Sequence, residues 1–190
     1  MPRSGEEARH RLQQAALELY GERGFDATTT AEIAARAGVT ERTYFRHFAD
    51  KREVLFDGEA TLGAALEATL DSTPEDVPPL QTLLRAFLAA VPRLEANRPL
   101  TEARHRVISA SSALQERQLA KGEYLKSTLA AALEARGTGE RVARLAAEVG
   151  WATWAQAVAG WLDDPSLTLA AHLTREFDDL AGLTSAVKPR

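Results

Sequence analysis

Apolar side chains recur along most of this chain at intervals of three and four residues, which places them on one face of an α-helix. The first such segment carries Leu12, Leu19 and Tyr20 on a common face and stops at residues 21–24. The alternation of apolar and polar residues that marks a β-strand does not appear in the sequence. The pattern therefore predicts an all-α protein.

Capping residues divide the next segment into short helices. Thr29, followed three residues later by Glu32, has the form of a capping box and opens a second helix. Gly38 ends that helix, because the tight turn there needs a positive φ. Thr40 can then cap a short third helix, and a fourth helix is predicted over about 50–70.

The stretch over 71–79 (DSTPEDVPP) is the clearest linker, with three prolines and no periodicity. Beyond it, apolar periodicity predicts helices at about 80–96, 101–109, 111–136, 140–163 and 166–182. We expect Pro92 to kink or end the first of these helices. Asp164 is predicted to cap the last one, with Pro165 at its first helical position.

The composition is that of an ordinary globular protein, since 45% of the 190 residues are apolar and 26% are charged. No apolar run approaches the roughly 20 residues of a membrane span, and the N-terminus lacks a signal-peptide core, so we expect a cytoplasmic protein with no membrane partner. The absence of cysteine excludes disulfides, thiolate nucleophiles and cysteine-ligated zinc. The common nucleotide and metalloprotease motifs are absent as well, so neither a cofactor nor an enzymatic activity is predicted.

Residues 22–56 carry the strongest functional signal. Ile33, Ala37, Val39 and Tyr44 are spaced to form a shared interior between two short helices joined at Gly38. The small side chain of Ala34 permits close packing. This is the arrangement of a helix-turn-helix, whose second helix enters the major groove of DNA. We therefore predict a three-helix DNA-binding domain at the N-terminus.

Charge alone would not have indicated DNA, because the net charge is −4 and residues 1–57 carry nine Arg or Lys against ten Asp or Glu. The predicted recognition helix nevertheless presents a small cationic face, with Arg42 as the candidate for a bidentate contact to guanine. The residues predicted to face DNA from this helix are Thr40, Glu41, Arg42, Thr43, Phe45 and Arg46. Those at helix ends, where phosphate contacts usually fall, are Thr28, Thr29, His47 and Lys51. The alternative is that these charged residues form only a solvated helix face.

The same stretch resembles the TetR family of repressors. The shared elements are Gly24-Phe25, Thr28-Thr29, Ile33-Ala34, Ala37-Gly38-Val39, Thr43, Phe45, His47-Phe48 and Lys51. The sequence departs from the family at Phe45, where a tyrosine often contacts phosphate, so an apolar contact with a sugar or a thymine methyl replaces that hydrogen bond.

The resemblance implies a DNA-binding domain over 1–55 and a helical effector-binding and dimerisation domain over 56–190. In such proteins the last two long helices form the interface of a homodimer, and the inner helix faces line a ligand cavity. Residues predicted to line that cavity are Leu66, Leu70, Phe87, His105, Tyr124, Trp151 and Trp154. The stripe of Trp151, Trp154, Val158 and Trp161 can equally be ordinary core or part of the dimer interface.

The sequence thus predicts a repressor that leaves a palindromic operator when a small, mostly apolar ligand binds. The tract over 150–166 resembles regulators that respond to fatty acyl-CoA thioesters, and a hydrophobic drug is the other candidate effector. Two alternatives remain. One is a DNA-binding protein without an effector. The other is a di-metal carboxylate enzyme, suggested by two Glu-x-x-His pairs, Glu7 with His10 and Glu102 with His105.

Overall fold

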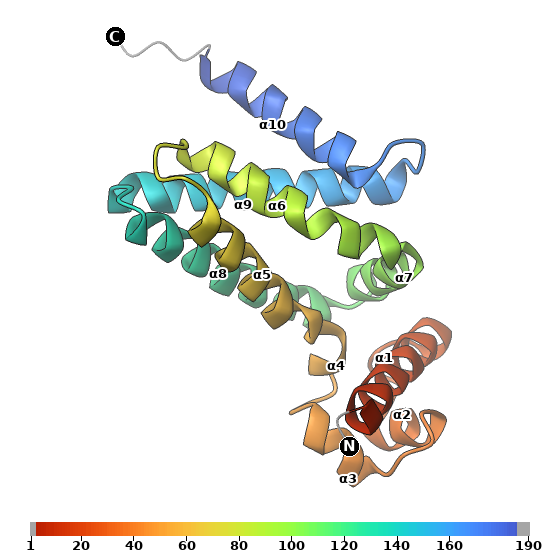
Figure 1. The fold of residues 1–190 in the computed structure, drawn as a ribbon. Coiled ribbons are helices and arrows are strands. Elements are labelled where there is room, and N and C mark those ends of the chain that lie inside the picture. The colour runs from red at the N-terminus through yellow and green to blue at the C-terminus, as the bar shows by residue number, and fades with distance from the viewer. Residues whose placement is uncertain (1–2, 186–190) are drawn as a thin grey trace. The chain divides into compact units, whose positions relative to one another are not determined.

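The computed structural model describes residues 3–185, and this part of the chain is folded entirely into helices and their connections (Figure 1). The helices are α1 (Arg3–Arg23), α2 (Thr30–Arg36), α3 (Glu41–His47), α4 (Glu53–Phe56), α5 (Gly58–Ser72), α6 (Pro79–Ala96), α7 (Arg98–Ser109), α8 (Ser112–Ala135), α9 (Glu140–Asp163) and α10 (Leu169–Ser185). The prediction of an all-α protein is confirmed. No helix of the described residues is long and apolar enough to cross a membrane.

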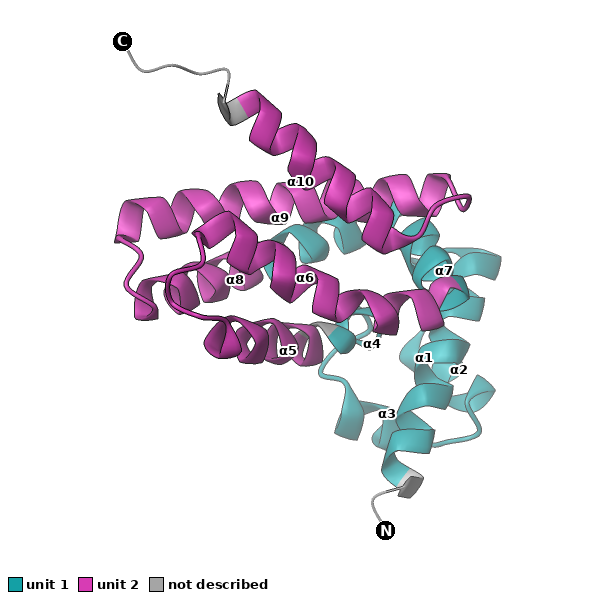
Figure 2. Cartoon of the chain, turned by 45° about the horizontal axis from the view of Figure 1, so that its top comes forward, with its two compact units in different colours: residues 1–59, 99–121 teal, residues 60–98, 122–190 magenta. Residues whose placement is uncertain are grey.

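The helices form two compact units (Figure 2). The first contains the described residues up to Glu59 together with Pro99–Lys121, and the second contains Ala60–Arg98 and the residues from Gly122 onward. Helix α8 therefore contributes its first part to one unit and the rest to the other. A single boundary between residues 55 and 56 does not describe these units, because residues 99–121 pack with the N-terminal helices.

The core of the first unit explains this grouping. Leu12 and Leu19 of α1 are buried with Tyr44 of α3. Val107 and Ile108 of α7 belong to the same cluster of buried side chains. These residues lie some 90 positions from α1, so no local periodicity could assign them to its core.

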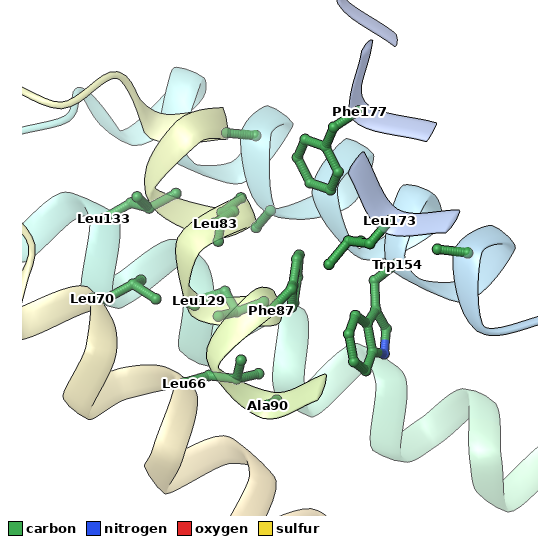
Figure 3. Close-up of a cluster of buried hydrophobic side chains, with 14 of the residues drawn as sticks. Leu66, Leu70, Leu83, Phe87, Ala90, Leu129, Leu133, Trp154, Leu173 and Phe177 are labelled. Carbon is green, nitrogen blue, oxygen red and sulfur yellow. The ribbon is translucent and has the colours of Figure 1, made fainter. Parts of the chain in front are cut away.

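The second unit is built around a cluster contributed by α5, α6, α8, α9 and α10 (Figure 3). Helix α9 packs against both α6 and α10. The rings of Phe87 and Trp154 are stacked with centroids 5.0 Å apart and planes at 25°, and Phe177 joins them from α10. Burial of large apolar side chains of this kind is the main source of stability for such a unit.

The predicted caps of the short helices are present. Thr29 accepts a hydrogen bond from the backbone N–H of Glu32, whose carboxylate accepts one from the backbone N–H of Thr29. Thr40 caps α3 by accepting from the backbone N–H of Thr43. Gly38 has φ of +68°, the conformation that the turn between α2 and α3 requires.

Pro92 does not end α6, which continues through it to Ala96. Two local predictions were wrong. The helix expected over 50–70 is divided at Asp57 into α4 and α5. Asp164 does not cap α10, because its carboxylate accepts from the backbone N–H of Ser166 in a turn, and the helix begins later, where Thr168 accepts from the N–H of Ala171.

Candidate DNA interface

The helix-turn-helix holds α3 through a small buried interface. Ile33 of α2, Ala37 of the turn and Tyr44 of α3 are buried, as their spacing predicted, and so is Ala34. Val39, which was predicted to share this interior, is half-buried and packs against its edge. Burial also raises the pKa of Tyr44 and Tyr20, so both hydroxyls stay protonated. Tyr44 donates to the backbone O of Asp50 at 3.1 Å, and Tyr20 to that of Lys51 at 2.6 Å, so both rings anchor the loop that follows α3.

The opposite face of α3 is open to solvent. Thr40, Glu41, Arg42, Phe45 and Arg46 are exposed there. The ring of Phe45 is 53% exposed, although its neighbour in the chain, Tyr44, is fully buried. This face of α3 therefore presents both charged and apolar side chains at the surface.

The arginines of α3 differ from the other arginines around them. Arg36 of α2 pairs with Glu22 at 3.0 Å, and Arg23 of α1 pairs with Glu32 at 2.8 Å. Within the described residues, the guanidinium groups of Arg42 and Arg46 make no hydrogen bond or ion pair. Their donors therefore remain available for phosphate oxygens or the acceptor atoms of guanine.

The other polar groups of α3 are partly engaged with each other. The hydroxyls of Thr40 and Thr43 are 3.0 Å apart, and Thr30 of α2 donates to the carboxylate of Glu41 at 2.5 Å. The second bond joins the start of α2 to the start of α3. It holds Glu41 in place at the exposed end of the recognition helix.

Two of the predicted phosphate contacts have internal partners in the structure. Thr28 is only 1% exposed, and its hydroxyl donates to the backbone O of Gly24 at 2.9 Å, so that hydroxyl is not presented to DNA. The ammonium of Lys51 donates to the backbone O of Phe25 at 2.8 Å and of Thr28 at 3.0 Å, and lies over the ring of Phe25. Both residues shape the loop before α2. Thr29 is exposed, but its hydroxyl is hydrogen-bonded to Glu32.

His47 lies at the C-terminal end of α3 and is half-buried. Its Nε2 is buried and has no hydrogen-bond partner among the described residues. Burial, reinforced by the positive charges of Arg46 and Arg9, lowers the pKa of the imidazole below its usual value. The ring is therefore largely neutral near pH 7.

Residues 12–57, which include this helix-turn-helix, match the model of the tetR family of bacterial regulatory proteins. This chain belongs to the TetR family. The transcriptional regulator TcmR of Streptomyces glaucescens is 32% identical to it over 134 residues, which cover 67% of this chain and 59% of TcmR. The match therefore spans less than two thirds of the length of TcmR.

Two further proteins match the TetR-family chain over most of its length. The putative mycofactocin biosynthesis transcriptional regulator MftR of Mycobacterium tuberculosis is 27% identical over 173 residues, which cover 89% of this chain and 87% of MftR. A solved transcriptional regulator from Rhodococcus sp. RHA1 is 25% identical with a TM-score of 0.55, and the match covers 95% of this chain and 99% of that one. Because the family and these relatives are regulators, the prediction that the chain is not an enzyme is confirmed.

The structure brings together five of the seven residues predicted to line a ligand cavity. Leu66, Leu70, Phe87 and Trp154 are buried in the core of the second unit (Figure 3). Trp151 is partly buried and packs against that core. His105 and Tyr124 were expected to supply polar groups to that cavity, and this placement was wrong. Tyr124 is 69% exposed on α8, and His105 is exposed on the part of α7 that belongs to the first unit. Both helices turn a different face to their core.

The tryptophan stripe is largely core. Trp154 and Trp161 are 5% and 2% exposed, whereas Trp151 is half-buried. The guanidinium of Arg98 lies 4.6 Å from the ring of Trp161 and donates to the backbone O of Trp161, near the end of α9. Trp151 and Val158 lie at the edge of the cluster, and Trp151 is next to Gly122 of α8.

The two Glu-x-x-His pairs do not form a metal site. His10 on α1 and His105 on α7 are both exposed, as is Glu7. No group of three or more potential metal-binding side chains comes together anywhere in the part of the chain that is described. The histidines thus lie on solvent-facing surfaces, away from any bundle interior.

Sequence reasoning missed a set of contacts around α4. The carboxylate of Glu53 receives hydrogen bonds from Arg117 of α8, with Nε–Oε1 at 2.6 Å, and lies 3.3 Å from Nζ of Lys121. Arg104 of α7 donates to the backbone O of Leu55 at 2.6 Å. These pairs are separated by about 50 to 70 positions, so no motif or helical period could have indicated them.

Proposed function

We propose that this chain is a transcription regulator that binds double-stranded operator DNA through α3 and acts as a repressor. The observation that carries the proposal is the exposed face of α3, where Arg42 and Arg46 have no partner within the described chain while neighbouring arginines are paired. A helix of this kind, held by α2 and a tight turn, is what a helix-turn-helix inserts into the major groove.

The test is a binding measurement on a DNA duplex enriched from a random library by the wild-type protein. Replacing Arg42 by alanine should cost about 1–3 kcal/mol, a loss of roughly 5–150-fold, and should relax the preference at one base of each half-site. Arg85→Ala removes the same charge from an exposed position of α6 and serves as the control. Unchanged affinity and base preference in Arg42→Ala would show that α3 does not read the DNA.

We also propose that the protein acts as a homodimer, because a two-fold dimer presents two recognition helices to a palindromic operator. Helices α9 and α10 carry apolar side chains with nothing packed over them: Val142 is 47% exposed, Leu145 is 62% exposed and Leu183 is 71% exposed. An open hollow runs along α10, lined by Ala170, Ala171, Thr174, Arg175, Asp178 and Asp179. A second copy of the chain would cover these surfaces.

A small, mostly apolar effector is proposed to bind in the second unit and release the DNA. The support is the aromatic and aliphatic character of the interior around Phe87, Trp151 and Trp154. Fatty acyl-CoA thioesters and hydrophobic drugs are the classes to screen, following tryptophan fluorescence and DNA release together. A compound that changes the fluorescence without weakening DNA binding would contradict this coupling, because linkage between two sites is reciprocal.

A further inference from the structure

We propose that Glu53, Arg117 and Lys121 form an ion-pair latch through which helix α8 positions α4 and, with it, the helix-turn-helix. The name latch is used below for these three side chains. The inference rests on the proposed function only where it assigns a change in DNA affinity to the movement of α4. None of the three residues of the latch lies on α3, so they act as positioning residues.

The latch is built to hold α4 in one place. Arg117 contacts Oε1 of Glu53 through both Nε and Nη2, at 2.6 and 2.5 Å, while Lys121 approaches Oε2. The three side chains are only 20–32% exposed, so solvent screens their attraction less than it screens a surface pair. Arg104 of α7 adds two further contacts to α4. Its Nε donates to the backbone O of Leu55, and its guanidinium lies over the ring of Phe56.

Helix α4 in turn joins the loop that supports the recognition helix. This helix has only four residues and cannot be stable on its own. The carboxylate of Asp50 accepts from the backbone N–H of Arg52 and Glu53, which caps α4. The backbone O of Asp50 receives the hydroxyl of Tyr44, a residue of α3. A shift of Glu53 is thus passed to α3 through two consecutive hydrogen bonds.

The other end of this connection lies along α8. Lys121 belongs to the latch, and the next residue, Gly122, packs against Trp151 of α9. A Cβ added at Gly122 would lie 3.2 Å from Nε1 of Trp151, closer than most side-chain contacts. Because α8 is continuous from Ser112 to Ala135, a displacement of its contact with Trp151 also displaces the turn that carries Arg117 and Lys121.

The first test needs no DNA and uses the full chain. Amide hydrogen exchange of residues 50–57 should become about tenfold faster in Glu53→Gln and in Arg117→Gln, because each variant removes charge-assisted hydrogen bonds that hold α4. The matched control is Glu148→Gln, which removes an ion pair between α9 and Lys126 of the same helix α8. Its exchange at 50–57 should stay within about twofold of wild type. Equal exchange in all variants would overturn the proposal.

The second test separates coupling from a purely local stabilising role. Gly122→Val widens the contact between α8 and Trp151, and it should accelerate exchange at 50–57 in the wild-type background. In the Glu53→Gln background the same substitution should add less than about twofold, since the latch is already broken. Additive effects, or no effect of Gly122→Val on α4, would overturn the proposal. Gly122→Ala is the smaller substitution to use if the valine variant does not fold.

The affinity for the selected DNA duplex then links the latch to function. Glu53→Gln should change it by at least about fivefold, and Glu148→Gln should not. If the wild-type protein binds no duplex, the proposed function fails while the exchange results still decide the latch. If the exchange rates respond as expected and DNA affinity does not, the latch does not regulate DNA binding and the proposal is wrong in that part.

Discussion

At the scale of single residues, Lys51 is a candidate for two roles, a contact to DNA phosphate and a structural support of the loop before α2. Its position after the recognition helix suggested a phosphate contact, yet its ammonium is bonded to the backbone oxygens of Phe25 and Thr28. These two bonds close the loop before α2 and lie beside the buried hydroxyl of Thr28. A structural role for Lys51 therefore has direct geometric support.

Lys51→Ala should lower the free energy of unfolding by about 1–3 kcal/mol, because two backbone oxygens lose a charged donor. Urea denaturation followed by circular dichroism measures this loss. Lys126→Ala, which removes a lysine from ion pairs with exposed glutamates, should cost about 0–1 kcal/mol. If the Lys51→Ala variant instead has the unfolding free energy of wild type, and its DNA affinity depends less on salt concentration, the ammonium contacts a DNA phosphate.

At the scale of elements, the turn between α2 and α3 determines where the recognition helix points. Gly38 has φ of +68°, and the backbone N–H of Val39 bonds to the O of Ala34 at 2.9 Å, so the chain reverses within three residues. Thr40 then starts α3 immediately. The direction of α3 thus depends on one backbone conformation that residues with a Cβ rarely adopt.

Gly38→Ala should destabilise the protein by about 1–2 kcal/mol, since a Cβ is strained at this φ. The effect is conformational rather than steric, because the nearest atom to an added Cβ is 3.8 Å away, at the end of the Arg11 side chain. Gly21→Ala, inside α1 and with nothing within 4 Å of the new Cβ, should stabilise by up to about 1 kcal/mol. Thermal unfolding of the two variants compares them directly, and a shift of the same sign in both would contradict this explanation.

At the scale of the whole molecule, the proposed homodimer accounts for apolar surface that the single chain leaves uncovered. Leu145→Lys on α9 should shift the protein towards monomer in sedimentation, because a charge would be buried at the interface between two copies. It should also weaken binding to a palindromic duplex more than to a single half-site. Leu119→Lys is the matched control, since Leu119 is 71% exposed on α8. A Leu145→Lys protein that remains fully dimeric would place the interface elsewhere.

The sequence by itself determined the local elements of the N-terminal region. The capping box at Thr29, the glycine turn and the buried spacing of Ile33, Ala37 and Tyr44 are properties of neighbouring residues, and all three appear in the structure. The outward face of α3 follows from the same helical period, so the exposure of Arg42 could be predicted as well. The family resemblance, confined largely to this region, was correct for the same reason.

Only the tertiary structure decided which distant segments share a core and which polar groups are already paired. The grouping of 99–121 with α1, the exposure of Tyr124 and the engagement of Lys51 all depend on contacts between residues far apart in the chain. Helical periodicity shows that a helix has an apolar face but not which helix covers it. The contacts of Glu53 with Arg117 and Lys121 likewise could not be found without the folded structure, because ion pairs depend on the distance between side chains rather than on sequence spacing.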